Sequence, residues 1–107
     1  MDIRNILQSI HPPRGEEELF DTLLERKDLH IERIISRGQT TPLGEWYDTV
    51  KNEWVVLLQG KATLEMEKGK TLHLSRGDSV FIPAREKHRV SYTSINPYCI
   101  WLAIHFD

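Results

Sequence analysis

Three side chains in the middle of this sequence have the chemistry to hold a divalent metal ion: the carboxylates of Asp48 and Glu53 and the imidazole of His88. Such a mixture suits Fe, Mn, Ni or Zn and leaves coordination positions open for water or a substrate. Without a cation, two carboxylates in one cavity repel each other, and one of them would take up a proton. The same residues also allow a simpler arrangement, in which Glu53 pairs with His88 or an arginine and Asp48 is a solvated loop residue. The residues alone leave both interpretations open.

Two further residues are candidates for catalysis. His105 falls on the same face of a C-terminal strand as Trp101 and Ala103, from which it could reach a cavity and act as a general base. Tyr47 could offer its hydroxyl group to a ligand. The alternatives are an imidazole whose hydrogen bonds are satisfied within the strand for His105, and packing in the core or at an interface for Tyr47. The remaining histidines lie in polar or turn segments and receive no chemical role: His11, His30 and His73.

The segments that must position these side chains have the pattern of short β-strands. Stretches of apolar and polar residues, many of them alternating, are separated by glycine, proline or asparagine turns, which is typical of an antiparallel sandwich or barrel. Towards the C-terminus, strands are predicted at Trp54–Gln59, Ala62–Met66, Thr71–Leu74, Ser79–Ile82, His88–Thr93 and Tyr98–Phe106. Earlier in the chain a strand is favoured for Leu29–Ser36, whereas Leu19–Arg26 fits a helix face as well as a strand. We therefore expect an all-β fold.

The N-terminal segment has a different pattern. Apolar residues recur there at helical spacing, at Ile3, Ile6, Leu7 and Ile10. Asp2 can cap such a helix, and the prolines that follow it end the stretch. We expect residues 1–15 to form a short helical arm on a single domain whose barrel spans residues 29–107. A helix this short is marginal alone, so it must dock on the body or on a second subunit, and together with open strand edges it predicts a homodimer.

Composition restricts the class of partner. The chain has 107 residues, enough for one domain with its own core, and a formal net charge of −2. No run of lysine and arginine is long enough to predict nucleic-acid binding. A single cysteine, Cys99, fits a reducing compartment, and neither a signal peptide nor an apolar span is recognisable. We therefore expect a cytoplasmic protein with a small-molecule ligand and no nucleic-acid or membrane partner.

The spacing of glutamate, glycine, proline and histidine resembles the two sequence motifs of the cupin family. Glu53 is followed after six residues by Gly60, as in the second half of the first motif. Gly77 is followed after five residues by Pro83, and His88 lies five positions further on, as in the second motif. The resemblance spans about half of the chain and implies a small single-domain cupin, an antiparallel jelly-roll barrel.

The sequence departs from the cupin motifs at three positions. The two histidines of the first motif fall on Trp46 and Asp48, and the glycine of Pro-x-Gly falls on Arg85. A typical cupin metal site has three histidines and one glutamate, so the resemblance implies that Glu53 and His88 are kept as ligands and that Asp48 replaces a histidine. It further implies a divalent metal, a small polar ligand inside the barrel and, for an enzyme, an oxygenase, isomerase or lyase. The alternative is a metal-free ligand-binding or sensor module without catalysis.

Overall fold

The computed structural model describes all residues, 1–107, and contains eight β-strands and no helix. The strands are β1 (Leu19–Arg26), β2 (Leu29–Ser36), β3 (Asn52–Gln59), β4 (Ala62–Met66), β5 (Thr71–Leu74), β6 (Ser79–Ile82), β7 (His88–Thr93) and β8 (Cys99–Phe106). The all-β prediction is confirmed, and the segment left open between helix and strand is β1. Because it contains no helix, the structure offers no helical segment that could span a membrane.

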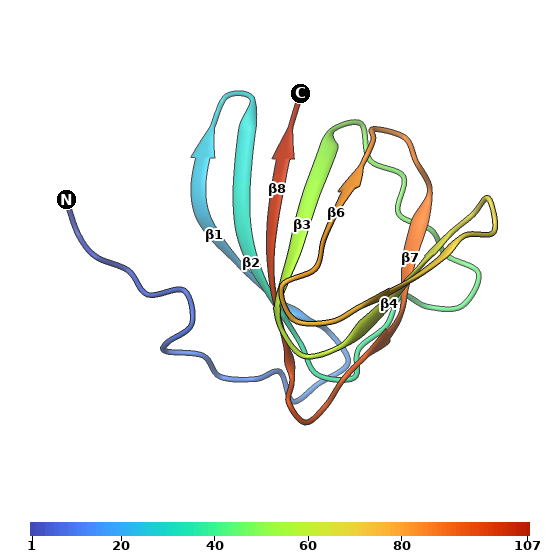
Figure 1. Cartoon of the computed structure of the whole chain (residues 1–107). Helices are drawn as coiled ribbons and strands as arrows, with labels where there is room; N and C mark the ends of the chain where they lie inside the picture. The colour runs from blue at the N-terminus through green and yellow to red at the C-terminus, as the bar shows by residue number, and fades with distance from the viewer.

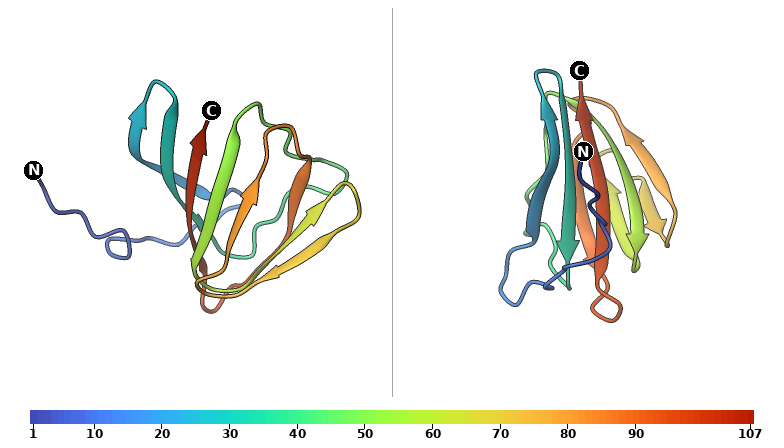
Figure 2. Two further views of the ribbon diagram at one scale, coloured as in Figure 1. Left: turned by 45° about the horizontal axis from the view of Figure 1, so that its top comes forward. Right: turned by 90° about the vertical axis from the view of Figure 1, so that its left-hand side faces the viewer.

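The strands form two sheets that face each other (Figures 1 and 2). The larger sheet has the strand order β1-β2-β8-β3-β6 and the smaller one β5-β4-β7, and every neighbouring pair is antiparallel. The C-terminal strand β8 therefore lies in the middle of the larger sheet, between β2 and β3. This order brings residues from the two ends and the centre of the sequence onto one inner surface.

The hydrophobic core lies between the two sheets. The larger sheet contributes Val55, Leu57 and Trp101, and the smaller sheet contributes Leu64 and Leu74, all of them at most 5% exposed. Each such side chain stabilises the fold by about 1.5–3 kcal/mol relative to an exposed one. Three of these core residues, Val55, Leu64 and Trp101, also line a cavity between the sheets.

Two backbone positions explain features of the sequence motifs. Gly60 has a φ of +92°, and a Cβ atom there would lie 2.8 Å from both Cys99 Sγ and Ser94 Oγ, so the turn after β3 requires glycine. Arg85, which replaces the glycine of the second motif, has a φ of +67°. This conformation is unfavourable for a residue with a Cβ atom. The Arg85 backbone N–H donates to Thr49 O at 2.7 Å, and its guanidinium group pairs with Asp48 at 3.1 Å.

The predicted N-terminal helix is wrong. Residues 1–15 form an extended arm with one turn, in which the Leu7 N–H donates to the side chain of Asn5 and Ser9 adopts a positive φ (Figure 1). Ile3 is fully exposed and Leu7 is 57% exposed. A helix of this length is not stable without an apolar surface to pack against, and asparagine and serine side chains favour turns over helix. The helical spacing of the apolar residues therefore did not produce a helix in the monomer.

Candidate functional site

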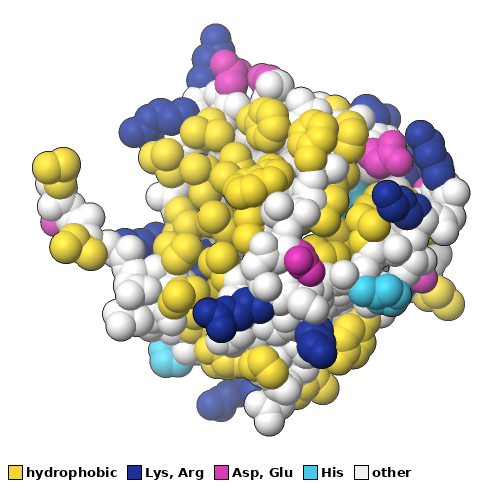
Figure 3. All heavy atoms as spheres, viewed as in Figure 1, with side chains coloured by type: hydrophobic (Ala, Val, Ile, Leu, Met, Phe, Trp, Pro, Cys, Tyr) yellow, Lys and Arg dark blue, Asp and Glu magenta, His cyan; other side chains and the backbone are white.

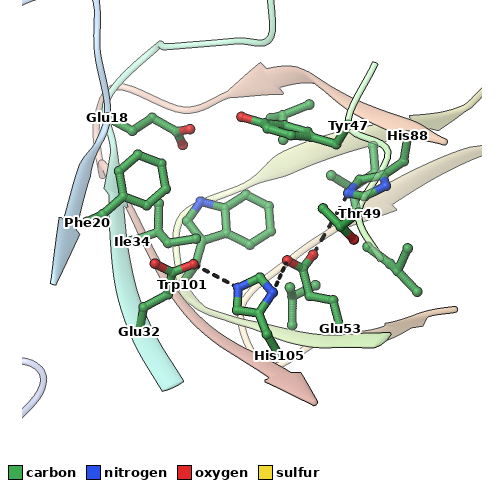
Figure 4. A pocket seen from close by; sticks show the side chains of 14 residues that line it. Glu18, Phe20, Glu32, Ile34, Tyr47, Thr49, Glu53, His88, Trp101 and His105 are labelled. Carbon is green, nitrogen blue, oxygen red and sulfur yellow. Dashed lines mark hydrogen bonds and ion pairs between the residues drawn. The ribbon is translucent and has the colours of Figure 1, made fainter. Parts of the chain in front are cut away.

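A cavity of about 180 Å³ opens between the two sheets (Figure 4). Its walls combine apolar side chains with acids and imidazoles, and no lysine or arginine is among them. The lining residues are Glu18, Phe20, Glu32, Ile34, Tyr47, Thr49, Glu53, Val55, Leu64, Ile82, His88, Val90, Trp101 and His105. An apolar cavity with a few convergent polar groups is the usual form of a small-molecule site.

Four polar side chains follow one another across this cavity, from the larger sheet to the smaller one, and we call them the polar row: Glu32, His105, Glu53 and His88. His105 Nε2 lies 2.8 Å from Glu32 Oε2, and its Nδ1 lies 3.3 Å from Glu53 Oε2. The other oxygen of Glu53 lies 3.9 Å from His88 Nε2. These side chains are between 6% and 17% exposed, so the row is largely shielded from solvent.

Strand pairing brings the polar row together. Glu53 of β3 is directly opposite His105 of β8, and β8 in turn pairs with β2, which carries Glu32. In a strand alternate side chains point to the same face, so these three positions all face inward. His88 begins β7 of the opposite sheet, where its Nδ1–H donates to Glu86 O at 2.9 Å. In the neutral tautomer this leaves a lone pair on Nε2, which faces Glu53.

The gap between Glu53 and His88 is the chemically useful part of the row. A separation of 3.9 Å is too long for a direct hydrogen bond, and such a gap suits a water molecule or a ligand atom that contacts both groups. One group can then give a proton to the ligand while the other accepts one. The site can therefore support general acid–base chemistry.

Burial and mutual contact shift the pKa values of the row. Burial raises the pKa of Glu53, although the nearby imidazoles of His105 and His88 counteract this effect. The hydrogen bond to Glu32 raises the pKa of His105 above its ordinary value of 6.5. Burial opposes ionisation of Glu32, but hydrogen bonds from His105 and His30 outweigh it and lower its pKa. Opposite shifts in neighbouring groups are typical of acid–base pairs at functional sites.

The structure places the predicted site residues in different positions. Glu53, His88, His105 and Tyr47 line the cavity together. Asp48 is not among the lining residues, because its carboxylate is held by the guanidinium group of Arg85. Of the three predicted metal ligands, the cavity thus brings together only two.

The donor groups do not fit a metal centre in this arrangement. No group of three or more histidine, cysteine, aspartate or glutamate side chains has the geometry to hold a metal ion. The two imidazoles lie on opposite sides of the Glu53 carboxylate, and His105 is already bound to Glu32. We therefore derive no chemical step through a metal, and the metal assignment stays a prediction.

Sequence reasoning missed Glu18, Phe20 and Glu32 as cavity residues. Glu18 immediately precedes β1 and Phe20 lies in it, the segment whose secondary structure the sequence left open. Glu32 lies in a predicted strand, but only its pairing with β8 places it beside His105. His30, which received no chemical role, lies directly opposite His105 and 3.5 Å from Glu32, at the outer end of the row. The sequence feature that could have identified Glu32 is its position two residues before Ile34 in β2, because alternate residues of a strand face the same side and both line the cavity.

Two antiparallel sheets that enclose a cavity with inward-facing acids and imidazoles define the class of small jelly-roll β-barrel proteins. Residues 35–105 match the model of the cupin domain family. The chain belongs to this family, as the spacing of Glu53, Gly60, Gly77, Pro83 and His88 indicates.

Solved structures resemble the whole chain. The crystal structure of a "putative mannose-6-phosphate isomerase" from Ralstonia eutropha is 39% identical, with a TM-score of 0.93 and coverage of 100% of this chain and 99% of that one. A cupin superfamily protein from Desulfitobacterium hafniense is 17% identical, with a TM-score of 0.79 and coverage of 99% and 92%. A DMSP lyase from Ruegeria pomeroyi is 18% identical, with a TM-score of 0.71 and coverage of 84% and 47%. No curated protein matches the chain.

Proposed function

We propose that this cupin binds a small polar molecule in the barrel cavity and transfers protons on it with the polar row. The observation that carries the proposal is the 3.9 Å gap between Glu53 and His88, which faces a cavity lined by apolar residues. His105 would favour the ionised form of Glu53, which lies beside it. Glu32 would orient His105 through the 2.8 Å hydrogen bond. Such proton transfers are steps of isomerisations and eliminations at carbon next to a carbonyl group.

The charge of the cavity restricts the ligand. Three carboxylates line it, from Glu18, Glu32 and Glu53, and no lysine or arginine does. A phosphate group would meet repulsion from these carboxylates, and the imidazole of His105 is already engaged by Glu32 and Glu53. The name of the 39% identical protein from Ralstonia eutropha refers to isomerisation of a sugar phosphate. That name supports proton-transfer chemistry, whereas the lining of this cavity favours a neutral or cationic molecule.

A ligand screen by nuclear magnetic resonance tests the proposal. Neutral, cationic and anionic polar compounds of similar size, including D-mannose and mannose 6-phosphate, are added to isotope-labelled protein. We expect neutral or cationic compounds to shift amide signals of β2, β3, β7 and β8, and mannose 6-phosphate to bind more weakly than D-mannose. A compound that binds is then incubated in D₂O, where carbon-bound hydrogen is expected to exchange with the parent protein and at least about tenfold more slowly with Glu53→Gln. If no compound shifts these signals, or if Glu53→Gln leaves exchange unchanged, the proposal is wrong.

The predicted metal site is tested in the same spectra. Mn²⁺ broadens signals near its binding position, and a site formed by Glu53 and His88 would broaden the first residues of β3 and β7. From the donor arrangement we expect no site-specific broadening and no rise in melting temperature with Fe²⁺, Ni²⁺ or Zn²⁺. Saturable broadening that His88→Ala removes would instead establish the metal as the cofactor.

We also propose that the protein forms a homodimer through the outer face of the larger sheet. Hydrophobic side chains gather over β1, β2, β8 and β3 (Figure 3). Trp54 and Phe81 are opposite each other on neighbouring strands, 38% and 54% exposed, and Phe81 stacks on Phe106. An apolar face of this kind is typical of a protein interface.

A second copy of the chain fits this face better than a charged partner does. Asp21 and Arg33 from β1 and β2 pair with each other, so the face can meet its own copy without repulsion between like charges. The guanidinium group of Arg33 also donates to the carbonyl groups of Ile6 and Gln8, which fixes the base of the N-terminal arm beside the sheet. The exposed Ile3 beyond it is free to contact the second copy.

Light scattering after size-exclusion chromatography tests the dimer. We expect the parent protein to have twice the chain mass of 12.5 kDa and Trp54→Glu to have the mass of one chain. Tyr92→Glu, which changes an exposed aromatic residue on the smaller sheet, is the matched control and should remain dimeric. A monomeric parent protein, or a Trp54→Glu variant that stays dimeric, would contradict the interface.

A further inference from the structure

Three aromatic side chains line the part of the cavity that opens beside Glu18, and the ring of one of them, Tyr47, also lies 5.5 Å from the His88 ring (Figure 4). Phe20 comes from β1, Trp101 from β8 and Tyr47 from the segment before β3. Trp101 is buried, whereas Phe20 and Tyr47 are 57% and 41% exposed. The rings therefore form a partly open box rather than a closed part of the core.

A chain of hydrogen bonds fixes the position of the Trp101 ring and ties it to an acid. The indole Nε1–H of Trp101 donates to Ser36 Oγ at 3.1 Å, and the Ser36 hydroxyl group donates to the carboxylate of Glu18. Ser36 is fully buried, so both bonds are shielded from water. Across the opening, the Tyr47 hydroxyl group points toward Glu18 (Figure 4). The box thus has one carboxylate at its rim.

No lysine or arginine lies beside the carboxylates of this region, and Glu18 has no ion-pair partner at all. Glu32 and Glu53 pair only with histidines. Burial and the charge of Glu32 raise the pKa of Glu18, which disfavours its ionised form, and a cation bound beside it would favour that form. A surface hollow of about 650 Å³ adjoins the opening and shares Glu18, Phe20 and Tyr47 with the cavity, and it adds Glu16 and Glu17 but again no lysine or arginine. The entrance therefore carries acidic side chains and no lysine or arginine, a lining that favours a positively charged ligand over a negatively charged one.

From this juxtaposition we infer that the open end of the cavity is a site for an alkylammonium group, with Phe20, Tyr47 and Trp101 as its walls and Glu18 as its counter-charge. Ring faces attract cations through their quadrupole, most strongly when the cation is desolvated, and a nearby carboxylate adds to the attraction. The inference depends on the proposed function, because it names the chemical class of the ligand that the cavity binds. According to this inference, the site recognises the positive charge of the ligand and not its polarity alone.

Choline and 3,3-dimethylbutan-1-ol are matched probes for this site. They have the same shape, but the first has a quaternary nitrogen where the second has a neutral carbon. We expect choline to bind at least about fivefold more tightly in a calorimetric or nuclear magnetic resonance titration, the ratio that a cation–π contact gives. Equal binding of both probes would overturn the cation site and leave ligand binding in the cavity intact. Failure of both probes to bind would overturn the cation site as well. The proposed function is tested separately, by the ligand screen and the hydrogen exchange in D₂O with Glu53→Gln.

Variants distinguish the box from other acidic surfaces. Phe20→Leu and Glu18→Gln should each weaken choline binding about threefold to tenfold and leave the binding of 3,3-dimethylbutan-1-ol nearly unchanged. Both positions are at the cavity rim, so the fold should tolerate the changes. Phe81→Leu, on the outer face of the sheet, is the control and should not alter the choline affinity. If Phe20→Leu and Phe81→Leu have the same effect, the aromatic box does not bind the cation.

Discussion

Replacing Trp101 with alanine is expected to lower the free energy of unfolding by about 4 kcal/mol, the usual cost of removing a large buried aromatic side chain. The residue is 4% exposed and belongs to the core cluster between the sheets. The substitution leaves a large void and removes the donor to Ser36 Oγ. Stabilities of small domains are about 5–15 kcal/mol, so this change removes a large part of the total.

Urea denaturation followed by circular dichroism measures the Trp101 effect at one fixed protein concentration, because a dimer's stability depends on concentration. Trp46→Ala is the matched control, since Trp46 is 36% exposed and a surface substitution costs at most about 1 kcal/mol. If the two variants lose the same free energy of unfolding, Trp101 is not packed in the core as described above.

Replacing His105 with alanine is expected to lower the free energy of unfolding by about 3 kcal/mol at pH 6, because it removes the shared partner of two nearly buried carboxylates. His73→Ala is the control: His73 lies on β5, where its Nδ1 makes an exposed contact with the Thr63 hydroxyl group. We expect the control to lose less than about 1 kcal/mol. A loss no larger for His105→Ala than for His73→Ala would contradict the polar row.

The His105 effect should depend on pH with a defined sign. The pKa of His105 is raised by Glu32, so its stabilising contribution is fully present below the ordinary value of 6.5 and is lost as the pH rises through the folded-state pKa. The pKa of Glu32 is lowered, so its contribution is present above 4.5 and is lost as the pH falls through the folded-state pKa. The difference in the free energy of unfolding between the parent protein and His105→Ala should therefore be largest between pH 4.5 and 6.5 and smaller at pH 9. A difference that grows continuously toward alkaline pH would contradict this assignment.

Local patterns predicted the strands well because alternation and turn residues act over short distances. The ends of β4, β5, β6 and β7 agree with the sequence pattern, and Glu53 and His88 were expected in a common cavity. Glu32 could not be recognised in the same way, because its role depends on the pairing of β2 with β8, about seventy residues later in the chain. The pattern of side chains within one strand gives its inward face but not its neighbour in the sheet.

The predicted N-terminal helix is wrong and Asp48 does not line the cavity, for related physical reasons, whereas the role of Asp48 as a metal ligand stays a prediction. Helical spacing of apolar residues predicts a helix only where a surface exists to cover that face, and Ile3 has none within the monomer. Asp48 was predicted to face the barrel from its position in the motif, but its carboxylate pairs at 3.1 Å with Arg85, which lies between β6 and β7. In both segments a tertiary contact, or its absence, outweighs the local pattern.

The position of β8 between β2 and β3 has a consequence for how the chain acquires its structure. The hairpin β1–β2 and the pair β3–β6 have no hydrogen-bonded strand in common until β8 inserts between them. Of the eight strands, the one synthesised last therefore joins the two halves, and cavity assembly must follow synthesis of almost the whole domain. Until that moment the nascent protein exposes two unpaired strand edges, one on β2 and one on β3, which are open to pairing with another chain.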